Sequence, residues 1–185
     1  MDGQKFFKIV LIIIAMIVGK LFSQYFITGT HYKTFKSEDG GYRVTIPTMN
    51  KSEVKTLNTP AGPINVFFQL ARDKNLGIEF GVSYFKLPEV LRSRMQTDGP
   101  DLFFDNTING MVQDSSGKIV NRQNVQFKSY PGRECEIRTS DDKCIKVKLF
   151  IVKGTAYQMI VNCFPEDRNH KKVREFFNSF ELTNI

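Results

Sequence analysis

The sequence of 185 residues contains only two histidines and three cysteines, and this scarcity restricts the chemistry open to it. His31 and His170 each stand alone, because neither belongs to a group of Cys, Asp or Glu residues at the spacing of metal ligands. The serine-hydrolase pattern GxSxG and the metalloprotease pattern HExxH are both absent. We therefore expect a protein that is not an enzyme and that holds no metal ion or cofactor.

The cysteines are odd in number, so at least one thiol is free. Cys135 and Cys144 flank a predicted turn and are the first candidates for a disulfide. Cys135 shares the apolar side of its strand with Ile137, whereas Cys144 precedes Ile145 and falls on the opposite side. Side chains that pair across two strands share a face, so we expect no structural disulfide. For Cys163 we expect the role of a small buried hydrophobic residue.

The chain carries a net charge of +7, but no long basic run accounts for it. The first 26 residues contain three lysines and one aspartate, which leaves a charge of +5 for the remainder. The most basic stretch is "HKK" at 170–172, and the 17 phenylalanines lie mostly at periodic core positions. These features disfavour nucleic acid as a partner and favour a mildly anionic protein or membrane surface.

The long hydrophobic stretch at the start of the chain has two interpretations. Residues 9–18 are uninterruptedly apolar, with Lys5 and Lys8 before them and Lys20 after them. As a helix they span roughly 15 Å, half of a bilayer core of about 30 Å, which is typical of a secretory signal. The cleavage sites that a signal needs are poor here, because "LFS" at 21–23 is bulky and "TGT" lies further downstream.

If the stretch is taken from Phe6 to Phe26, it spans about 31 Å as a helix, enough to cross a membrane. We predict that residues 1–27 form an uncleaved signal-anchor and that residues 28–185 form one globular domain. We expect no lipid attachment, because no cysteine lies near the run. A cleaved signal and a cytosolic leader remain as alternatives. The predicted anchor residues are Phe6, Ile9, Leu11, Ile14, Ile17, Leu21, Phe22 and Tyr25. We expect a single-pass membrane protein with its domain on the exported side.

Alternating apolar and polar residues at 42–46, 64–70 and 78–84 predict antiparallel strands. Helical spacing predicts one helix that begins at Pro100 and another that begins near Pro165. Because strands and helices are grouped, the fold class is α+β. Apolar residues also occur on the nominally polar face of the strands, which indicates that helices flank the central sheet as an α/β/α sandwich. These residues are Phe67, Phe150 and Ile160.

The late hairpin has a register that its charges predict. If Ile137 lies opposite Ile145, then Glu136 faces Lys146 and Glu134 faces Lys148. Each of these opposite-charge pairs is worth about 0.2–1 kcal/mol. The acidic pair at 141–142 then belongs to the turn rather than to a catalytic site.

Three stretches resemble the PsbP-like superfamily, which includes DcrB-like exported proteins and a Ran-binding nuclear import factor of the same fold. They are "TFKSEDGGYRVTIP" near the start, "GRECEIRT…KCIKVKLFIVKGTAYQMIV" in the late strands and "VREFFNSFEL" at the end. The resemblance spans about residues 32–184. It implies a central antiparallel sheet between helices and a function in binding other proteins, often while attached to a membrane. It implies no shared active site.

The first expectation for function is a non-catalytic, membrane-tethered protein-interaction or accessory domain of an envelope or membrane complex. Its partners would be membrane lipid, through the N-terminal helix, and another protein. The alternative is an exported module that binds a lipid or a small ligand in a groove between the sheet and the Phe104–Val112 helix. Gly77, Gly81 and Ser83 leave one sheet face thinly covered, although small residues also let a helix pack closely.

Overall fold

The computed structural model describes residues 28–29, 31–59 and 62–183, and two sheets dominate it. The large sheet has eight strands in the order β1-β5-β6-β10-β9-β8-β7, with β4 also paired to β5. Its strands are β1 (Thr28–Gly29), β4 (Asn50–Thr59), β5 (Gly62–Asp73), β6 (Ile78–Lys86), β7 (Lys118–Phe127), β8 (Tyr130–Arg138), β9 (Cys144–Val152) and β10 (Thr155–Cys163). All its pairings are antiparallel except that of the two-residue β1 with β5. The small sheet is β11-β3-β2, formed by β2 (Tyr32–Ser37), β3 (Tyr42–Pro47) and β11 (Glu181–Leu182).

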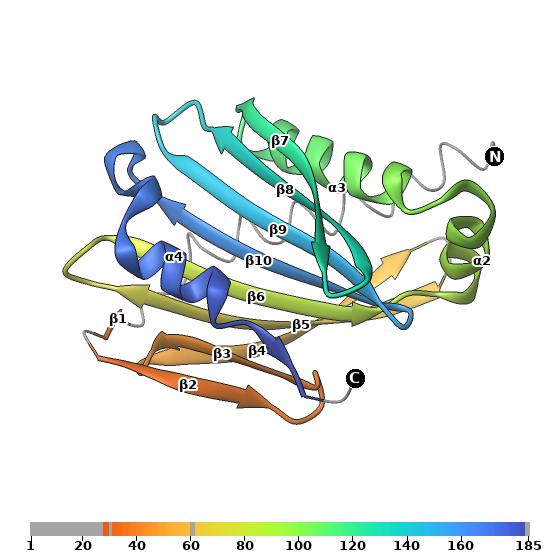
Figure 1. Cartoon of the computed structure of the whole chain (residues 1–185), viewed down its shortest axis with the longest axis horizontal. Coiled ribbons are helices and arrows are strands. Elements are labelled where there is room, and N and C mark those ends of the chain that lie inside the picture. The colour runs from red at the N-terminus through yellow and green to blue at the C-terminus, as the bar shows by residue number, and fades with distance from the viewer. Residues whose placement is uncertain (1–27, 30, 60–61, 184–185) are drawn as a thin grey trace.

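Helices cover both faces of the large sheet, as Figure 1 shows: α4 crosses in front of it and α3 lies behind its β7–β8 end. The helical elements are α2 (Glu89–Asp98), α3 (Asp101–Asp114), the 3-10 helix η1 (Pro165–Asn169) and α4 (Lys171–Asn178). One core, which includes Phe104 and Ile108, packs α2 and α3 on the sheet. The other, which includes Phe80 and Phe176, packs α4 and the small sheet on the opposite face. The predicted α+β class and the flanking of the sheet by helices are confirmed.

The predicted register of the β8–β9 hairpin is also confirmed, since Ile137 lies opposite Ile145. Lys148 Nζ lies 3.2 Å from Glu134 Oε2, as the charge pattern predicted. Glu136 lies opposite Lys146 in the register, but its ion pair is with Arg168 of η1, at 3.7 Å. This difference arises because η1 lies beside β9 and brings a second cation to the same carboxylate.

One predicted boundary was wrong, and one strand was missed. The final helix does not begin near Pro165, because residues 165–169 form the 3-10 helix η1. His170 interrupts the helix with an extended backbone, and its Nδ1 accepts a hydrogen bond from the Lys172 N–H at 3.2 Å, so α4 begins at Lys171. His170 is therefore the residue that caps the helix. In addition, the sequence pattern did not reveal β4.

The predicted anchor lies outside the described residues, and so do all of its eight side chains. Within the part of the chain that the structure describes, no helix is both long enough and apolar enough to cross a membrane.

The turn between β2 and β3 brings the small sheet against the large one. Gly41 has a φ of +60°, which favours glycine, and a Cβ on Gly40 would lie 2.7 Å from ring atoms of both Tyr42 and Tyr84. The Gly40 carbonyl accepts a hydrogen bond from the Tyr157 hydroxyl at 3.0 Å. The paired glycines of the "SEDGGY" motif thus let the backbone approach the aromatic side chains of β6 and β10.

We expect Gly40→Ala to destabilise the domain by about 1–3 kcal/mol, because the added methyl group overlaps two packed rings. Urea unfolding of the variant and the parent measures this difference. Gly99→Ala is a control for backbone strain without overlap: Gly99 ends α2 at a positive φ, which Gly40 does not have, and a Cβ there meets nothing within 4 Å. A loss of stability at Gly40 no larger than that at Gly99 would contradict the close packing.

Glu79 of β6 is a carboxylate in the middle of a cross-strand row. Its Oε2 accepts a hydrogen bond from Asn162 Nδ2 at 2.9 Å, and its Oε1 lies 4.0 Å from Arg72 Nη1. Burial raises the pKa of Glu79 despite these two partners. The folded state therefore holds the proton of Glu79 more tightly than the unfolded state does. Its stabilising contribution is fully present below the unfolded pKa and is lost as the pH rises through the folded pKa.

We expect Glu79→Gln to be more favourable for stability at pH 7 than at pH 4, because the amide cannot ionise and still accepts the hydrogen bond from Asn162. Urea unfolding of variant and parent at both pH values gives the difference. Glu38→Gln, at an exposed ion pair with Lys36, controls for the general effect of losing one surface charge. A variant that gained more at pH 4 than at pH 7 would reverse the sign and refute the argument.

Candidate functional site: the α4 hollow and the β7 edge

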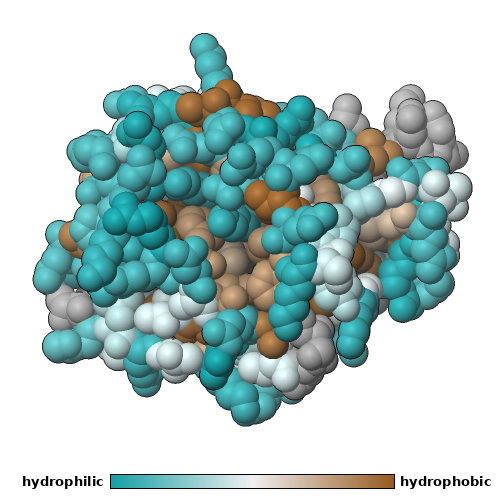
Figure 2. Space-filling view, viewed as in Figure 1, coloured by the Kyte–Doolittle hydropathy of each residue, from teal (hydrophilic) through white to brown (hydrophobic). Residues whose placement is uncertain are grey.

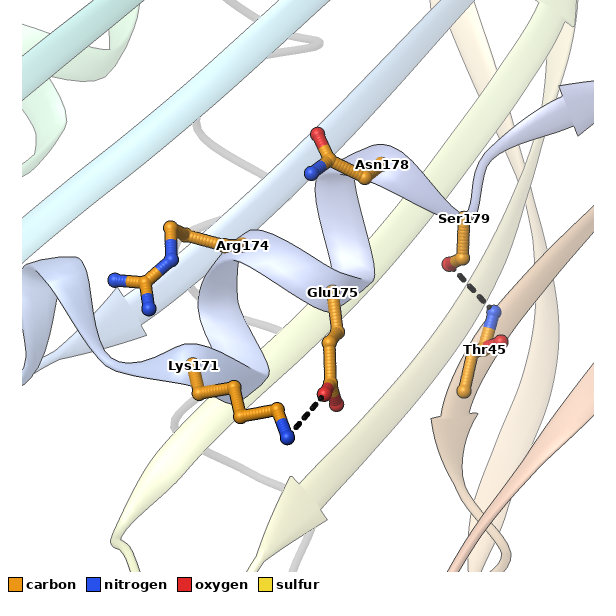
Figure 3. Close-up of a pocket in the computed structure, with 6 residues that line it drawn as sticks. All are labelled: Thr45, Lys171, Arg174, Glu175, Asn178 and Ser179. Atoms are coloured by element: carbon orange, nitrogen blue, oxygen red, sulfur yellow. Dashed lines mark hydrogen bonds and ion pairs between the residues drawn. The ribbon is translucent and has the colours of Figure 1, made fainter.

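An open hollow of about 600 Å³ lies between α4 and β3. We call it the α4 hollow, and Figure 3 shows the six side chains that line it: Thr45, Lys171, Arg174, Glu175, Asn178 and Ser179. Ser179 fixes its inner end, since its hydroxyl oxygen accepts a hydrogen bond from the Thr45 N–H at 2.9 Å and its O–H donates to the Phe176 carbonyl at 2.9 Å. The bond to Thr45 joins the end of α4 to the small sheet.

The charges around the α4 hollow are largely satisfied within α4 and the adjoining η1. Glu175 lies 2.8 Å from Lys172 Nζ and 3.6 Å from Lys171 Nζ. The hydrogen bond from Lys172 holds the pKa of Glu175 below its usual value, so the carboxylate stays ionised. The Arg174 guanidinium donates to the carbonyl of Asn169. The hollow is therefore a solvated surface with little free charge, suited to contact with another surface more than to enclosing a small molecule.

Half-buried aromatic side chains extend from this region toward β7 and β8. Figure 2 shows apolar residues at the floor of a depression in the middle of this face, surrounded by hydrophilic ones. Phe127, Tyr130 and Phe177 are partly buried against the core beneath α4. Lys148 Nζ lies 5.3 Å from the centre of the Phe177 ring and covers part of it.

The second feature is the outer edge of β7, which we call the β7 edge. β7 pairs with β8 on one side, and no strand among residues 28–29, 31–59 and 62–183 pairs with its other side. Residues 118–124 are all exposed, and Val120, which is 61% exposed, forms a bulge between Ile119 and Asn121. Unpaired backbone at a sheet edge is a template for another strand.

The register identifies which backbone groups of β7 point outward. The β7–β8 turn consists of two residues, 128–129, and Phe127 lies opposite Tyr130. The pair that flanks such a turn exchanges both hydrogen bonds, and bonded and non-bonded pairs then alternate along the ladder. By this count the N–H and C=O groups of Arg122, Asn124 and Gln126 point away from β8. Pro131, which has no N–H, falls opposite Gln126 at a non-bonded position, as the count requires.

Ion pairs to α3 hold this end of the sheet in place. Arg133 of β8 is almost fully buried, and its guanidinium contacts Asp101 at 2.7 Å and Asp105 at 3.1 Å. Arg122 of β7 also reaches Asp105, at 3.3 Å. The Arg133 guanidinium lies 5.9 Å from the centre of the Phe104 ring. Since α3 braces both β7 and β8, the β7 edge is presented on a supported strand.

The other residues that the sequence singled out are mostly structural. Cys135 belongs to the core beneath α3, while Cys144 and Cys163 belong to the core beneath α4, so the predicted opposite faces of Cys135 and Cys144 are confirmed. The acidic residues at 141–142 serve the turn: Asp141 accepts a hydrogen bond from Thr139 and Asp142 pairs with Arg138. Within the described ranges, no three His, Cys, Asp or Glu side chains are grouped to hold a metal ion.

The groove that the small residues of β6 suggested is occupied by α3. Gly81 is buried and Ser83 is 4% exposed. Ser83 lies opposite Gln158, whose Nε2 is 4.0 Å from Met111 Sδ of α3. The small residues therefore allow the helix to pack closely on the sheet.

No model of a known protein family matches the chain, and no curated protein matches it. Among solved structures, it is similar to the cyanobacterial PsbP protein (CyanoP) of Synechocystis sp. PCC 6803, with 15% identity and a TM-score of 0.54 over 83% of this chain and 93% of that one. It also matches a Pseudomonas aeruginosa protein of unknown function, described as a putative regulator, with 10% identity over 78% of this chain and 90% of that one. The TM-score of 0.39 for the second protein is too low to support an argument. The first likeness concerns the fold alone, and this chain has a PsbP-like fold.

Proposed function

We propose that this chain is a non-catalytic accessory protein that binds a partner protein through the β7 edge while its N-terminal segment holds it at a membrane. The observation that carries the proposal is the open backbone of β7, a strand of ten residues with outward-pointing N–H and C=O groups. An extended segment of a partner can add to such an edge, with backbone hydrogen bonds for affinity and side-chain contacts for specificity. The PsbP-like fold is compatible with an accessory domain of this kind.

Charge indicates which kind of segment fits. Between residues 118 and 128 the chain has Lys118, Arg122 and Lys128 and no acidic residue, and of these Arg122 already pairs with Asp105 of α3. The other edge strand, β4, is different, because Glu53 lies between Lys51 and Lys55 and pairs with both. The β7 edge therefore favours an extended acidic segment, with the exposed Ile119 and Val120 as its apolar contacts.

The membrane part of the proposal rests on the sequence. Phe6 to Phe26 is long enough to cross a bilayer as a helix, with Lys8 and Lys20 near its two ends. A tether of this kind raises the effective concentration of the domain for partners at the same membrane. A weak strand-addition contact is sufficient in that setting.

For the tether, we expect the protein from washed native membranes to have the intact mass of residues 1–185. Retention of the N-terminal segment makes Phe6 to Phe26 a permanent anchor. A mass that begins near residue 24 or 31, found in the soluble exported fraction, would replace the tether with a cleaved signal and leave the β7 interaction to be tested in solution.

For the β7 edge, a photoreactive residue at position 123 of the full-length protein, irradiated in its native membranes, reports any segment that lies alongside. We expect one discrete protein adduct. Asn124→Pro removes an outward N–H that β8 does not use, and edge strands tolerate proline at such positions. Loss of one hydrogen bond to the partner should lower the adduct yield by about fivefold.

Asn124→Ala is the matched control, because it removes the same side chain but keeps the N–H and should leave the yield nearly unchanged. Equal losses in the two variants would show that side-chain contact, and not strand addition, forms the adduct. An adduct consisting of two copies of this chain, or of lipid alone, would refute the acidic partner.

A further inference from the structure

The hairpin of β9 and β10 brings two cysteines together that lie 19 residues apart in the sequence. Cys144 is the first residue of β9, Cys163 is the last residue of β10, and the two are directly opposite in the register. Directly opposite residues of antiparallel strands have Cα atoms about 4.5–5.5 Å apart and side chains on the same face. This separation falls within the range of about 4.4–6.8 Å that disulfides span.

We propose that Cys144 and Cys163 are a disulfide-forming pair, which closes a covalent link between the ends of β9 and β10. Both side chains are 2% exposed and belong to the same core. The Cys163 sulfur lies 3.8 Å from the carbonyl oxygen of Cys144, so its side chain points back across the ladder toward its neighbour.

The two thiols differ in the direction of their pKa shifts, which gives an expected order of reaction. The side-chain interaction between the two thiols lowers the pKa of Cys144 and raises that of Cys163. Cys144 is therefore the thiolate that attacks first, because the thiolate is the nucleophile in exchange. Cys135 differs from both, since burial raises its pKa to about 11 and it lies in the opposite core.

The reaction requires a disulfide oxidant, such as a small-molecule or protein disulfide. The Cys144 thiolate attacks one sulfur of the oxidant and expels the other as a thiolate, which leaves a mixed disulfide on Cys144. Cys163 then loses its proton and attacks the Cys144 sulfur, which expels the second thiolate. The pair of cysteines loses two electrons and two protons, and the oxidant is reduced to two thiols.

The link joins a part of the fold that is otherwise held by few side chains. η1 begins two residues after Cys163, with Phe164 between them half exposed. η1 is attached to the neighbouring strands by the Arg168–Glu136 ion pair and by the hydrogen bond from Lys146 Nζ to the Arg168 carbonyl, at 3.3 Å. A bond at Cys144–Cys163 would prevent the end of β10 from separating and would fix the start of the segment that leads to α4.

The test uses the full-length protein in detergent, incubated with oxidised glutathione with and without 2 M urea, which opens strand ends. Trypsin separates the three cysteines into peptides 134–138, 144–146 and 154–168. We expect the last two to be joined, the intact mass to fall by two hydrogens, and Cys135 to remain available for alkylation after denaturation. We also expect the melting temperature to rise by roughly 5–10 °C on oxidation.

Cys135→Ser should keep both the joined peptides and the rise in melting temperature, whereas Cys144→Ser and Cys163→Ser should lose both. Reduction with dithiothreitol should restore the original mass. Three results would overturn the pair: a link that includes peptide 134–138, a link between two chains, or free Cys144 and Cys163 after oxidation in both conditions. None of these results depends on the membrane tether or on the partner at β7.

Discussion

Tyr42 is where the two sheets and the last helix meet. Its ring is stacked on that of Phe180, with 5.5 Å between the ring centres. The ring centres of Tyr84 and Tyr157 lie 5.9 Å and 6.5 Å from that of Tyr42. These partners come from the segment after α4, from β6 and from β10. Each aromatic contact adds about 0.5–1.5 kcal/mol beyond the burial of its surface. Val44 and Ile46 of β3 belong to the same core. The aromatic cluster and these aliphatic side chains together hold the small sheet on the large one.

Burial also fixes the chemical state of the cluster. Desolvation is the main cause that raises the pKa values of Tyr42, Tyr84 and Tyr157, which keeps the phenols neutral. The Tyr157 hydroxyl donates a hydrogen bond to the Gly40 carbonyl. Buried backbone carbonyl groups need such a partner. The glycines at 40–41 are therefore part of the same arrangement, because a side chain at Gly40 would push the turn away from the rings. The "SEDGGY" segment, which lies in one of the stretches that resemble the PsbP-like superfamily, makes this contact.

The sequence predicted what alternation and charge specify directly. Strands with a buried face showed a period of two, and the opposite charges on β8 and β9 gave the register of that hairpin correctly. β4 was missed because an edge strand needs few apolar residues, and only Leu57 of β4 is fully buried. The start of α4 was misplaced because Pro165 and the acidic residues after it are suitable for either a 3-10 or an α-helix. His170 decides the boundary, and its capping bond is not visible in a hydrophobic pattern.

The candidate site was less accessible to prediction. The three basic residues and the absence of acidic ones at 118–128 were not singled out in the sequence, and nothing in the pattern shows that β7 is the last strand of the sheet. The Cys144–Cys163 pairing was predictable in principle. Lys153 and Gly154 both have positive φ values and form a two-residue turn, and equal counting along both strands from that turn places the two cysteines opposite each other. The Cys144–Cys163 pair was missed because only Cys135 and Cys144, which are nearer in the sequence, were considered as partners.

The strand order of the small sheet determines when its packing can be completed during synthesis. β3 pairs with β2 on one side and with β11 on the other, and Arg43 lies opposite Glu181, 138 residues later in the chain. On a ribosome, Tyr42 is therefore synthesised long before Phe180, the ring that stacks on it. Until the final segment emerges, the first hairpin cannot complete its packing, and contacts so distant in sequence form slowly. The nascent chain must spend most of its synthesis with this aromatic surface uncovered, so the domain closes only as its last residues arrive.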